Sequence, residues 1–238
     1  MMLGYLAGCA NPKTAHPQDP YEPVNRVLFK INDKLDKYAI KPIAKKYNVI
    51  VPIPLNRGLD NFFANIKDFP NVINDILQAN FYQAASDAWR FTFNTTIGIG
   101  GLFDVAAIIG LQQNKNDFGL TLAKWGYHNS SYFFIPIVGP KTIRDFVGWA
   151  GDSYISVYAF ISDFYSRLSL YLMSKLDDRA RLLRFQSVYK TMALDPYVFV
   201  RDLYFQHRTY QIRRMKELDD PYTDKDMRDF QEDYYIDE

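Results

Sequence analysis

Hydrophobic residues recur at helical spacing along most of the chain, and this pattern predicts a series of amphipathic helices. In the first, over about residues 24–39, apolar side chains return every three or four positions with charged residues between them. We expect this helix to end before Pro42, because proline lacks the N–H that a helix interior needs. Residues 49–54 are apolar but contain two prolines, so we expect an extended link there.

Three further helices are predicted before residue 94. Asn56 suits the N-cap of a helix that ends at Pro70, and Asn71 suits the cap of the next one. A fourth helix runs from about Tyr82 to Phe93. Proline and asparagine therefore set the expected boundaries in this part of the chain.

Residues 91–140 are poor in charge, and only Asp104, Lys115, Asp117 and Lys124 are charged there. The apolar run 97–111 is shorter than the roughly 20 residues that cross a bilayer. It suits either a buried core segment or a segment that contacts the membrane interface or lipid tails. The candidates for lipid-channel or membrane contact are Ile97, Ile99, Leu102, Phe103, Ile108, Phe133 and Phe134.

The second half of the chain is also predicted to be helical. One helical stretch covers residues 141–176, with a break expected near 148–153, and two more helices cover 177–192 and 197–216. No segment shows a persuasive strand alternation. The fold class we predict is all-α.

The chain of 238 residues is long enough for one large domain, which we assign to residues 24–216. Residues 175–216 contain ten basic and four acidic residues, whereas 217–238 contain ten acidic and two basic ones. We interpret 217–238 as an acidic, mobile tail. The alternative is a protein-docking surface, or attraction of the basic part to lipid phosphates.

The N-terminus contains the single cysteine of the chain, Cys9. Leu6-Ala7-Gly8-Cys9 resembles a bacterial lipobox, in which the cysteine is acylated, palmitate being one such chain, and becomes the new N-terminus. We therefore expect residues 1–8 to be the remainder of a signal peptide and 9–23, rich in proline, to be a lipidated tether. A secretory signal has a basic start and an apolar run of about 7–15 residues, so the start here would lie inside a longer signal peptide.

Composition excludes some classes of protein and leaves others open. Hydrophobic residues make up 48% and the net charge is +1, which argues against disorder and against nucleic acid as the main partner. Aromatic residues make up 16%. They suit either an aromatic core or a bilayer interface, where amphipathic rings are favoured.

Catalytic and metal-binding motifs are not recognisable in the sequence. There is no G-x-S-x-G elbow, and His16, His128 and His207 lie far apart, without the spacing of a metal site. The glycines of 97–102 lack the third spaced glycine of a phosphate loop. We expect a protein that is not an enzyme and needs neither metal nor cofactor.

Short motifs in a fixed order carry a resemblance to one family over about residues 19–210. They are Asp19-Pro20-Tyr21-Glu22-Pro23, Lys41-Pro42-Ile43-Ala44, Asn56-Arg57-Gly58-Leu59-Asp60-Asn61-Phe62, Arg90-Phe91-Thr92-Phe93-Asn94-Thr95-Thr96, Gly100-Gly101-Leu102-Phe103-Asp104-Val105-Ala106, Asp117-Phe118-Gly119, Pro136-Ile137-Val138-Gly139-Pro140 and Asp195-Pro196-Tyr197. Together they resemble the MlaA/VacJ outer-membrane lipoproteins.

The resemblance implies a ring-like bundle of amphipathic helices in the periplasmic leaflet of the outer membrane, with a central amphipathic channel. Mislocalised phospholipids would leave the outer leaflet through this channel without a covalent step. The implied partners are phospholipid, trimeric porins and the soluble periplasmic lipid carrier MlaC. A second hypothesis is an anchored envelope scaffold that binds porins and moves no lipid.

Sparse charges around the apolar section are candidates for contact with lipid headgroups at a pore mouth. They are Asp104, Lys124, Arg144 and Asp145. The alternative for each is structural ion pairing, because a charge that folding buries needs a partner.

Overall fold

The computed structural model describes residues 16–186 and 193–219, and this part of the chain is mostly helical, as predicted. Cys9, the predicted signal remnant at residues 1–8 and most of the predicted tail, beyond residue 219, lie outside the described residues.

The first helical arm is longer than expected. Helix α1 (Glu22–Leu35) continues through a π-helical turn, η1 (Asp36–Ile40), into α2 (Lys41–Ile50). The expected end before Pro42 was wrong. Pro42 lies in the first turn of α2, and the π turn before it already changes the hydrogen-bond spacing, so the missing N–H is tolerated.

Only Val51 and Pro52 separate α2 from helix α3 (Ile53–Leu77), so the extended link is shorter than the expected range 49–54. The predicted boundary at Pro70 was also wrong, because α3 runs straight through it. Polar side chains after the proline hold this part in place. The Asn71 side chain donates to the carbonyl of Asn114 at 2.8 Å, and that of Asn74 donates to Asp152 at 2.8 Å. These tertiary bonds help offset the helix bond that proline removes.

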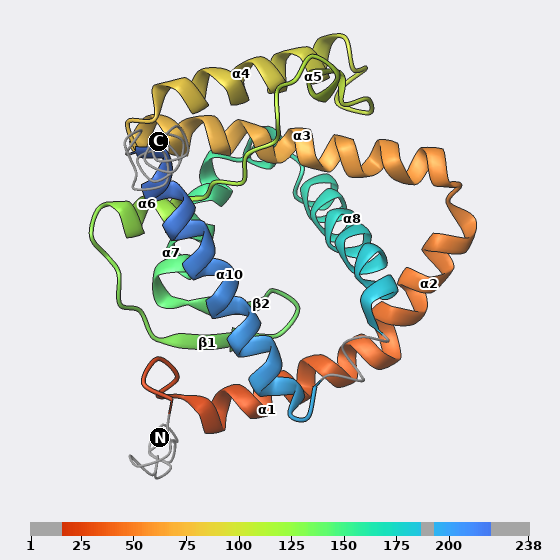
Figure 1. Cartoon of the computed structure of the whole chain (residues 1–238). Coiled ribbons are helices and arrows are strands. Elements are labelled where there is room, and N and C mark those ends of the chain that lie inside the picture. Colours follow the sequence, from red (N-terminus) through yellow and green to blue (C-terminus); the bar gives the residue numbers. More distant parts are fainter. Residues whose placement is uncertain (1–15, 187–192, 220–238) are drawn as a thin grey trace, which may run out of the picture.

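The predicted fourth helix is confirmed as α4 (Phe81–Thr96), which lies beside α3 (Figure 1). The Asn80 side chain caps it by accepting from the N–H of Gln83 at 3.2 Å. The charge-poor section then forms turns and two short helices, α5 (Val105–Ile108) and α6 (Phe118–Lys124).

An antiparallel hairpin follows, which the sequence pattern did not predict. Strands β1 (Tyr132–Ile135) and β2 (Gly139–Thr142) pair Tyr132 with Thr142 and Ile135 with Gly139. Each strand has four residues, too few to display an alternation. Asn25 of α1 stabilises the hairpin, because its amide donates to the Tyr132 carbonyl and accepts from the Phe134 N–H at 2.9 Å.

The remaining helices differ from prediction mainly in their boundaries. No break occurs at residues 148–153, since α7 (Ile143–Ile155) is continuous. Its Gly148 allows close packing against α6: a Cβ there would lie 2.3 Å from the Gly119 nitrogen. The actual interruption comes later, at the 3-10 turn η2 (Val157–Phe160).

The expected boundary at residue 177 was wrong, because α8 (Phe164–Leu182) continues through it and ends in the 3-10 turn η3 (Leu183–Phe185). After residues 187–192, which are not described, α10 (Pro196–Asp219) extends from the predicted separation at Asp195-Pro196. The predicted helix over 197–216 is therefore confirmed.

Figure 1 shows α1, α2 and α3 following one another around the outline of the molecule. Helix α10 lies with α6 and α7 on the remaining side, and α8 crosses the interior between α3 and α2. The Arg179 guanidinium of α8 binds Asp36 at 2.7 Å, and the Tyr47 hydroxyl of α2 donates to Asp177 at 3.1 Å. These bonds fix α8 against the first arm.

The folded domain begins earlier than residue 24. Asp19, which we assigned to the tether, is fully buried and accepts a hydrogen bond from the Tyr197 hydroxyl at 2.5 Å. It also accepts from Asn25 at 2.8 Å. These contacts join the segment before α1 to α10, so the last residues of the expected tether belong to the fold.

Candidate functional site

The distribution of polar and apolar side chains is unlike that of a water-soluble domain. Among the described residues, 19 buried residues are polar or charged and 13 are hydrophobic. Large hydrophobic side chains are exposed along α1, at the start of α3 and around the 97–109 turns. An exposed apolar surface of this extent marks a site of protein or membrane interaction.

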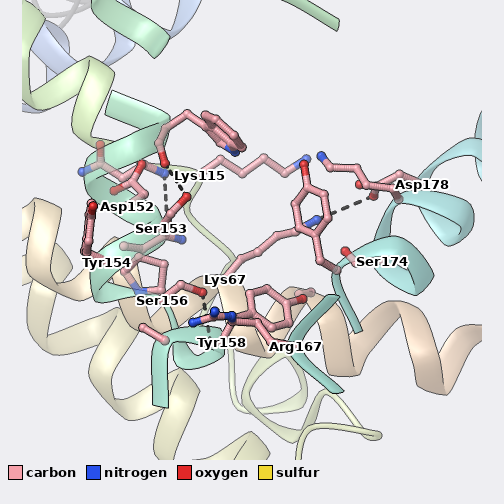
Figure 2. Close-up of a pocket in the computed structure, with 18 of the residues that line it drawn as sticks. Lys67, Lys115, Asp152, Ser153, Tyr154, Ser156, Tyr158, Arg167, Ser174 and Asp178 are labelled. Atoms are coloured by element: carbon pink, nitrogen blue, oxygen red, sulfur yellow. Dashed lines mark hydrogen bonds and ion pairs between the residues drawn. The ribbon is translucent and has the colours of Figure 1, made fainter. Parts of the chain in front are cut away.

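A cavity of about 910 Å³ opens between α3, α7, η2 and α8. Figure 2 shows Asp152, Ser153 and Tyr154 of α7 on one side of it and Ser174 and Asp178 of α8 on the other. Aromatic and aliphatic side chains, among them Tyr171 and Leu168, lie on the same wall as charged ones. The lining is therefore amphipathic, and its volume lies near the top of the range of small-molecule sites, about 300–1,000 Å³.

Ion pairs join α3 and α8 along the cavity. Arg181 binds Asp60 and Asp178 and contacts Asp177 at 3.0 Å. The Lys67 ammonium reaches Asp178 at 3.6 Å, an ion pair that Figure 2 marks. These bonds hold the two helices on either side of the opening at a fixed separation.

Asp152 connects the cavity wall to α6. Its carboxylate accepts from the Phe118 N–H at 3.0 Å and from the Asn74 amide at 2.8 Å. Burial raises the pKa of Asp152 to about 6, although both hydrogen bonds act in the opposite direction.

Most of the sequence-predicted apolar candidates are exposed. Ile99 and Ile108 have exposed fractions of 65% and 83%, and Ile97 and Phe103 are exposed as well. Leu102 and Phe133 are half-buried. None of these six lines the cavity, and Ile97, Ile99, Phe103 and Ile108 lie at the surface. A hydrophobic surface loop of this kind suits contact with an apolar phase.

Phe134 is the exception, and the expectation of lipid contact was wrong for it. It is only 3% exposed and lies in a hydrophobic cluster with Tyr132 and Tyr197. Its ring meets that of Phe29 edge to face at 5.4 Å. Because side chains alternate along strand β1, Phe134 points into the hydrophobic cluster and Phe133 is only half-buried.

Two headgroup candidates form a buried ionic network instead of a pore mouth. Arg144 and Asp145 are buried and paired at 3.0 Å. Asp145 also accepts from Tyr204 and from Arg208, at 2.6 Å for the nearer Arg208 nitrogen. Burial alone would raise the pKa of Asp145, but Arg208, Tyr204 and Arg144 hold it at about 2. Arg144 and Asp145 therefore form a structural ion pair, which was the alternative to headgroup contact.

The other two headgroup candidates also have local roles. Asp104 caps α5 by accepting from the Ala107 N–H at 3.1 Å, and it binds Arg90 at 3.1 Å. Lys124 is half-buried in the last turn of α6 and has interactions within the protein. Neither residue lines the cavity.

The charged cavity residues were missed by reasoning from sequence. Lys67, Lys175 and Arg181 lie on helices whose polar faces are indistinguishable from solvated ones until the helices are assembled. One signal was present: Asp177 and Arg181 stand four residues apart, a spacing that allows pairing on a helix.

No helix in the described part of the chain is long and apolar enough to cross a membrane. Within the same residues, no group of three or more His, Cys, Asp or Glu side chains is arranged to hold a metal ion.

Comparison with known proteins places this arrangement in one family. The family model described as MlaA lipoprotein matches residues 17–211. The Escherichia coli protein named intermembrane phospholipid transport system lipoprotein MlaA is 31% identical, over 86% of this chain and 83% of its own. An uncharacterized protein of Rickettsia typhi is 36% identical, over 80% of this chain and 76% of its own.

A solved structure described as the structural basis for maintenance of bacterial outer membrane lipid asymmetry has the same fold. It superposes with a TM-score of 0.74 at 30% identity and covers 82% of this chain and 98% of its own. Since the family model spans most of the chain and the fold agrees along the same length, the chain belongs to the MlaA lipoprotein family.

Proposed function

We propose that this protein is held in the periplasmic leaflet of the outer membrane by an acyl chain on Cys9 and gives phospholipids a route out of the outer leaflet. The amphipathic cavity between α3 and α8 is the observation that carries the proposal. The names of the relatives support it, since they are called phospholipid transport lipoproteins.

The physical need for such a cavity comes from the acyl chains. Each methylene that enters water costs about 0.8 kcal/mol, so two chains cost on the order of 20 kcal/mol. A passage with apolar and polar walls lowers this barrier by keeping the tails out of water while the headgroup remains solvated. No bond needs to form or break, so we propose a transport protein and not an enzyme.

The exposed apolar side chains would face lipid. Ile99, Phe103 and Ile108 in the turns after α4 and Val27 and Ile31 on α1 are exposed. Burying one such side chain is worth about 1.5–3 kcal/mol, so a few of them add substantially to the marginal membrane binding of a single acyl chain. We further propose that trimeric porins hold the protein laterally and that the carrier MlaC receives the lipid.

Narrowing the cavity tests this proposal. Ala64 lines the opening on α3, whereas Ala85 is exposed on α4 outside it. In cells that lack the chromosomal copy, Ala64→Trp should raise phospholipid in the outer leaflet, and Ala85→Trp should leave it at the wild-type level. The measurement is surface labelling of phospholipid, with membrane fractionation as a control for amount and location.

The scaffold hypothesis makes the opposite prediction. A scaffold that only binds porins needs no open cavity, so Ala64→Trp would then leave outer-leaflet phospholipid unchanged while porin co-purification persists. That result would contradict the transport proposal.

A further inference from the structure

Basic side chains outnumber acidic ones on the cavity wall by five to three. The basic residues are Lys67, Lys115, Arg167, Lys175 and Arg181, and the acidic ones are Asp60, Asp152 and Asp178.

The acidic members already have partners inside the protein. Arg181 binds both Asp60 and Asp178, and Asp178 also meets Lys67. Asp152 accepts hydrogen bonds from the scaffold, as described above. Their negative charge therefore does not neutralise the other basic side chains of the cavity wall.

Three of the basic residues form no ion pair with any other residue among 16–186 and 193–219. They are Lys115, Arg167 and Lys175. The Arg167 guanidinium lies 6.0 Å from the centre of the Phe164 ring, and the Lys175 ammonium lies 5.5 Å from that of Tyr171. The excess positive charge of the cavity thus remains available to something that enters it.

Among these three basic residues, Lys175 has the environment that most favours binding of an anion. Burial lowers its pKa, Asp178 opposes this effect, and the positive charges of Lys67 and Lys141 add to it. A negative group beside Lys175 would relieve both the lost hydration and the repulsion between like charges.

A hydrogen-bond donor without a partner lies on the same wall. The Tyr171 hydroxyl is buried and has no hydrogen-bond partner in the described part of the chain. Burial raises the pKa of Tyr171, so the hydroxyl keeps its proton and remains a donor. A buried donor in this state costs about 1–3 kcal/mol until it finds an acceptor.

We propose that Lys175, Lys67 and the Tyr171 hydroxyl form a binding site for the phosphate of a phospholipid, and that the excess positive charge of the wall makes the cavity prefer lipids with a net negative headgroup over zwitterionic ones. This inference rests on the proposed transport function and adds a substrate class to it. Phosphate is a stronger acceptor than a neutral group, and charge-assisted hydrogen bonds are about twice as strong as neutral ones.

The neighbouring side chains favour a lipid over a soluble phosphate compound. Phe164 and Leu168 line the cavity on the same helix as Lys175, about three and two turns before it, and Trp149 lines it from α7. They offer an apolar wall for methylene groups next to the basic one. An ammonium group on the headgroup would instead meet the excess positive charge of the wall.

Binding of two fluorescent phospholipids to the purified full chain in detergent tests the site. Phosphatidylglycerol and phosphatidylethanolamine with identical acyl chains differ only in the headgroup. We expect phosphatidylglycerol to bind at least about tenfold more tightly, because the ammonium group of phosphatidylethanolamine meets the positive charge of the wall. The Lys67→Gln/Lys175→Gln double variant should lose this preference, because its affinity for phosphatidylglycerol falls further than its affinity for phosphatidylethanolamine, which carries the same phosphate.

A matched control removes the same charge elsewhere. Lys45 and Lys46 are exposed on α2 and do not line the cavity, so Lys45→Gln/Lys46→Gln should keep the preference. Tyr171→Phe should weaken phosphatidylglycerol binding by roughly threefold, as expected for one hydrogen bond. Circular dichroism of every variant checks that the fold is intact.

Equal binding of the two lipids to the wild type, or an equal loss in the Lys45/Lys46 control, would overturn the phosphate site but leave the transport proposal standing. Glycerol phosphate that displaces phosphatidylglycerol at similar concentrations would also overturn it, because the site would then serve soluble phosphates. The transport proposal fails separately, when Ala64→Trp leaves outer-leaflet phospholipid unchanged.

Discussion

Buried carboxyl groups dominate the interior between α3 and α4. Asp68, Asp75 and Asp87 are all less than 2% exposed. Burial raises the pKa of Asp87 to about 7, and a hydrogen bond with Asp75 adds to the effect. Asp87 therefore carries a proton near neutral pH and shares it with Asp75, so one negative charge is buried in place of two.

This pair makes stability depend on pH. The folded state binds a proton at Asp87 that the unfolded chain releases above its ordinary pKa of 3.8, so the free energy of unfolding falls as the pH rises towards 7. Asp87→Asn mimics the protonated form and should make this fall smaller. Burial also raises the pKa of Asp68 and of Asp152 to about 6, so both groups titrate in the same pH range. Part of the pH dependence of the unfolding free energy should therefore remain in the variant.

Urea unfolding between pH 5 and pH 8 measures the effect. Asp33→Asn, at an exposed position of α1, is the control and should keep the wild-type slope. An Asp87→Asn variant with an unchanged slope would show that Asp87 is ionised in the folded protein.

At the scale of elements, one guanidinium joins three helices. Arg208 of α10 binds Asp117 at the start of α6 at 2.7 Å and Asp145 in the first turn of α7 at 2.6 Å. Tyr204, one turn earlier on α10, donates to the same Asp145 and accepts from the Thr142 N–H at 2.9 Å. These polar contacts position α10 together with the hydrophobic cluster around Tyr197 at its other end.

Arg208→Ala should therefore lower the free energy of unfolding by about 3–5 kcal/mol, since it leaves Asp117 and Asp145 without their main counter-charge. Arg213→Ala, on an exposed part of α10, should change it by less than about 0.5 kcal/mol. Both values come from urea titration at one pH. Equal effects of the two substitutions would mean that the network contributes nothing specific.

At the scale of the whole molecule, many large hydrophobic side chains are exposed and many polar and charged ones are buried among the described residues. Helices α1, α2 and α3 follow the outline in Figure 1 and expose hydrophobic side chains, while charged residues line the cavity between α3 and α8. Exposed hydrophobic side chains in such number favour contact with an apolar phase or partner, because that contact removes them from water.

Vesicle binding tests the outer surface. Ile99→Asp combined with Ile108→Asp should reduce sedimentation of the protein with phospholipid vesicles by at least tenfold, since each isoleucine contributes about 1.5–3 kcal/mol when it is buried. Gln112→Asp, exposed and polar from the start, adds a charge close by and should have a much smaller effect. Undiminished binding of the double variant would place the membrane contact elsewhere.

The helical class and the family could be predicted from the sequence alone, because periodicity and ordered motifs are local properties. The charge-poor run around Ile99 and Ile108 was also visible there, but its exposure was not, since a buried core segment fitted the same pattern. Phe134 shows the limit, since whether a hydrophobic residue faces lipid or core depends on the pairing of two four-residue strands. Asp145 shows the same for charge, because its partners Tyr204 and Arg208 lie about 60 residues away. The helix through Pro70 and the basic wall around Lys175 were likewise decided only by tertiary structure, where distant segments supply the hydrogen bonds and the neighbouring charges that no single segment contains.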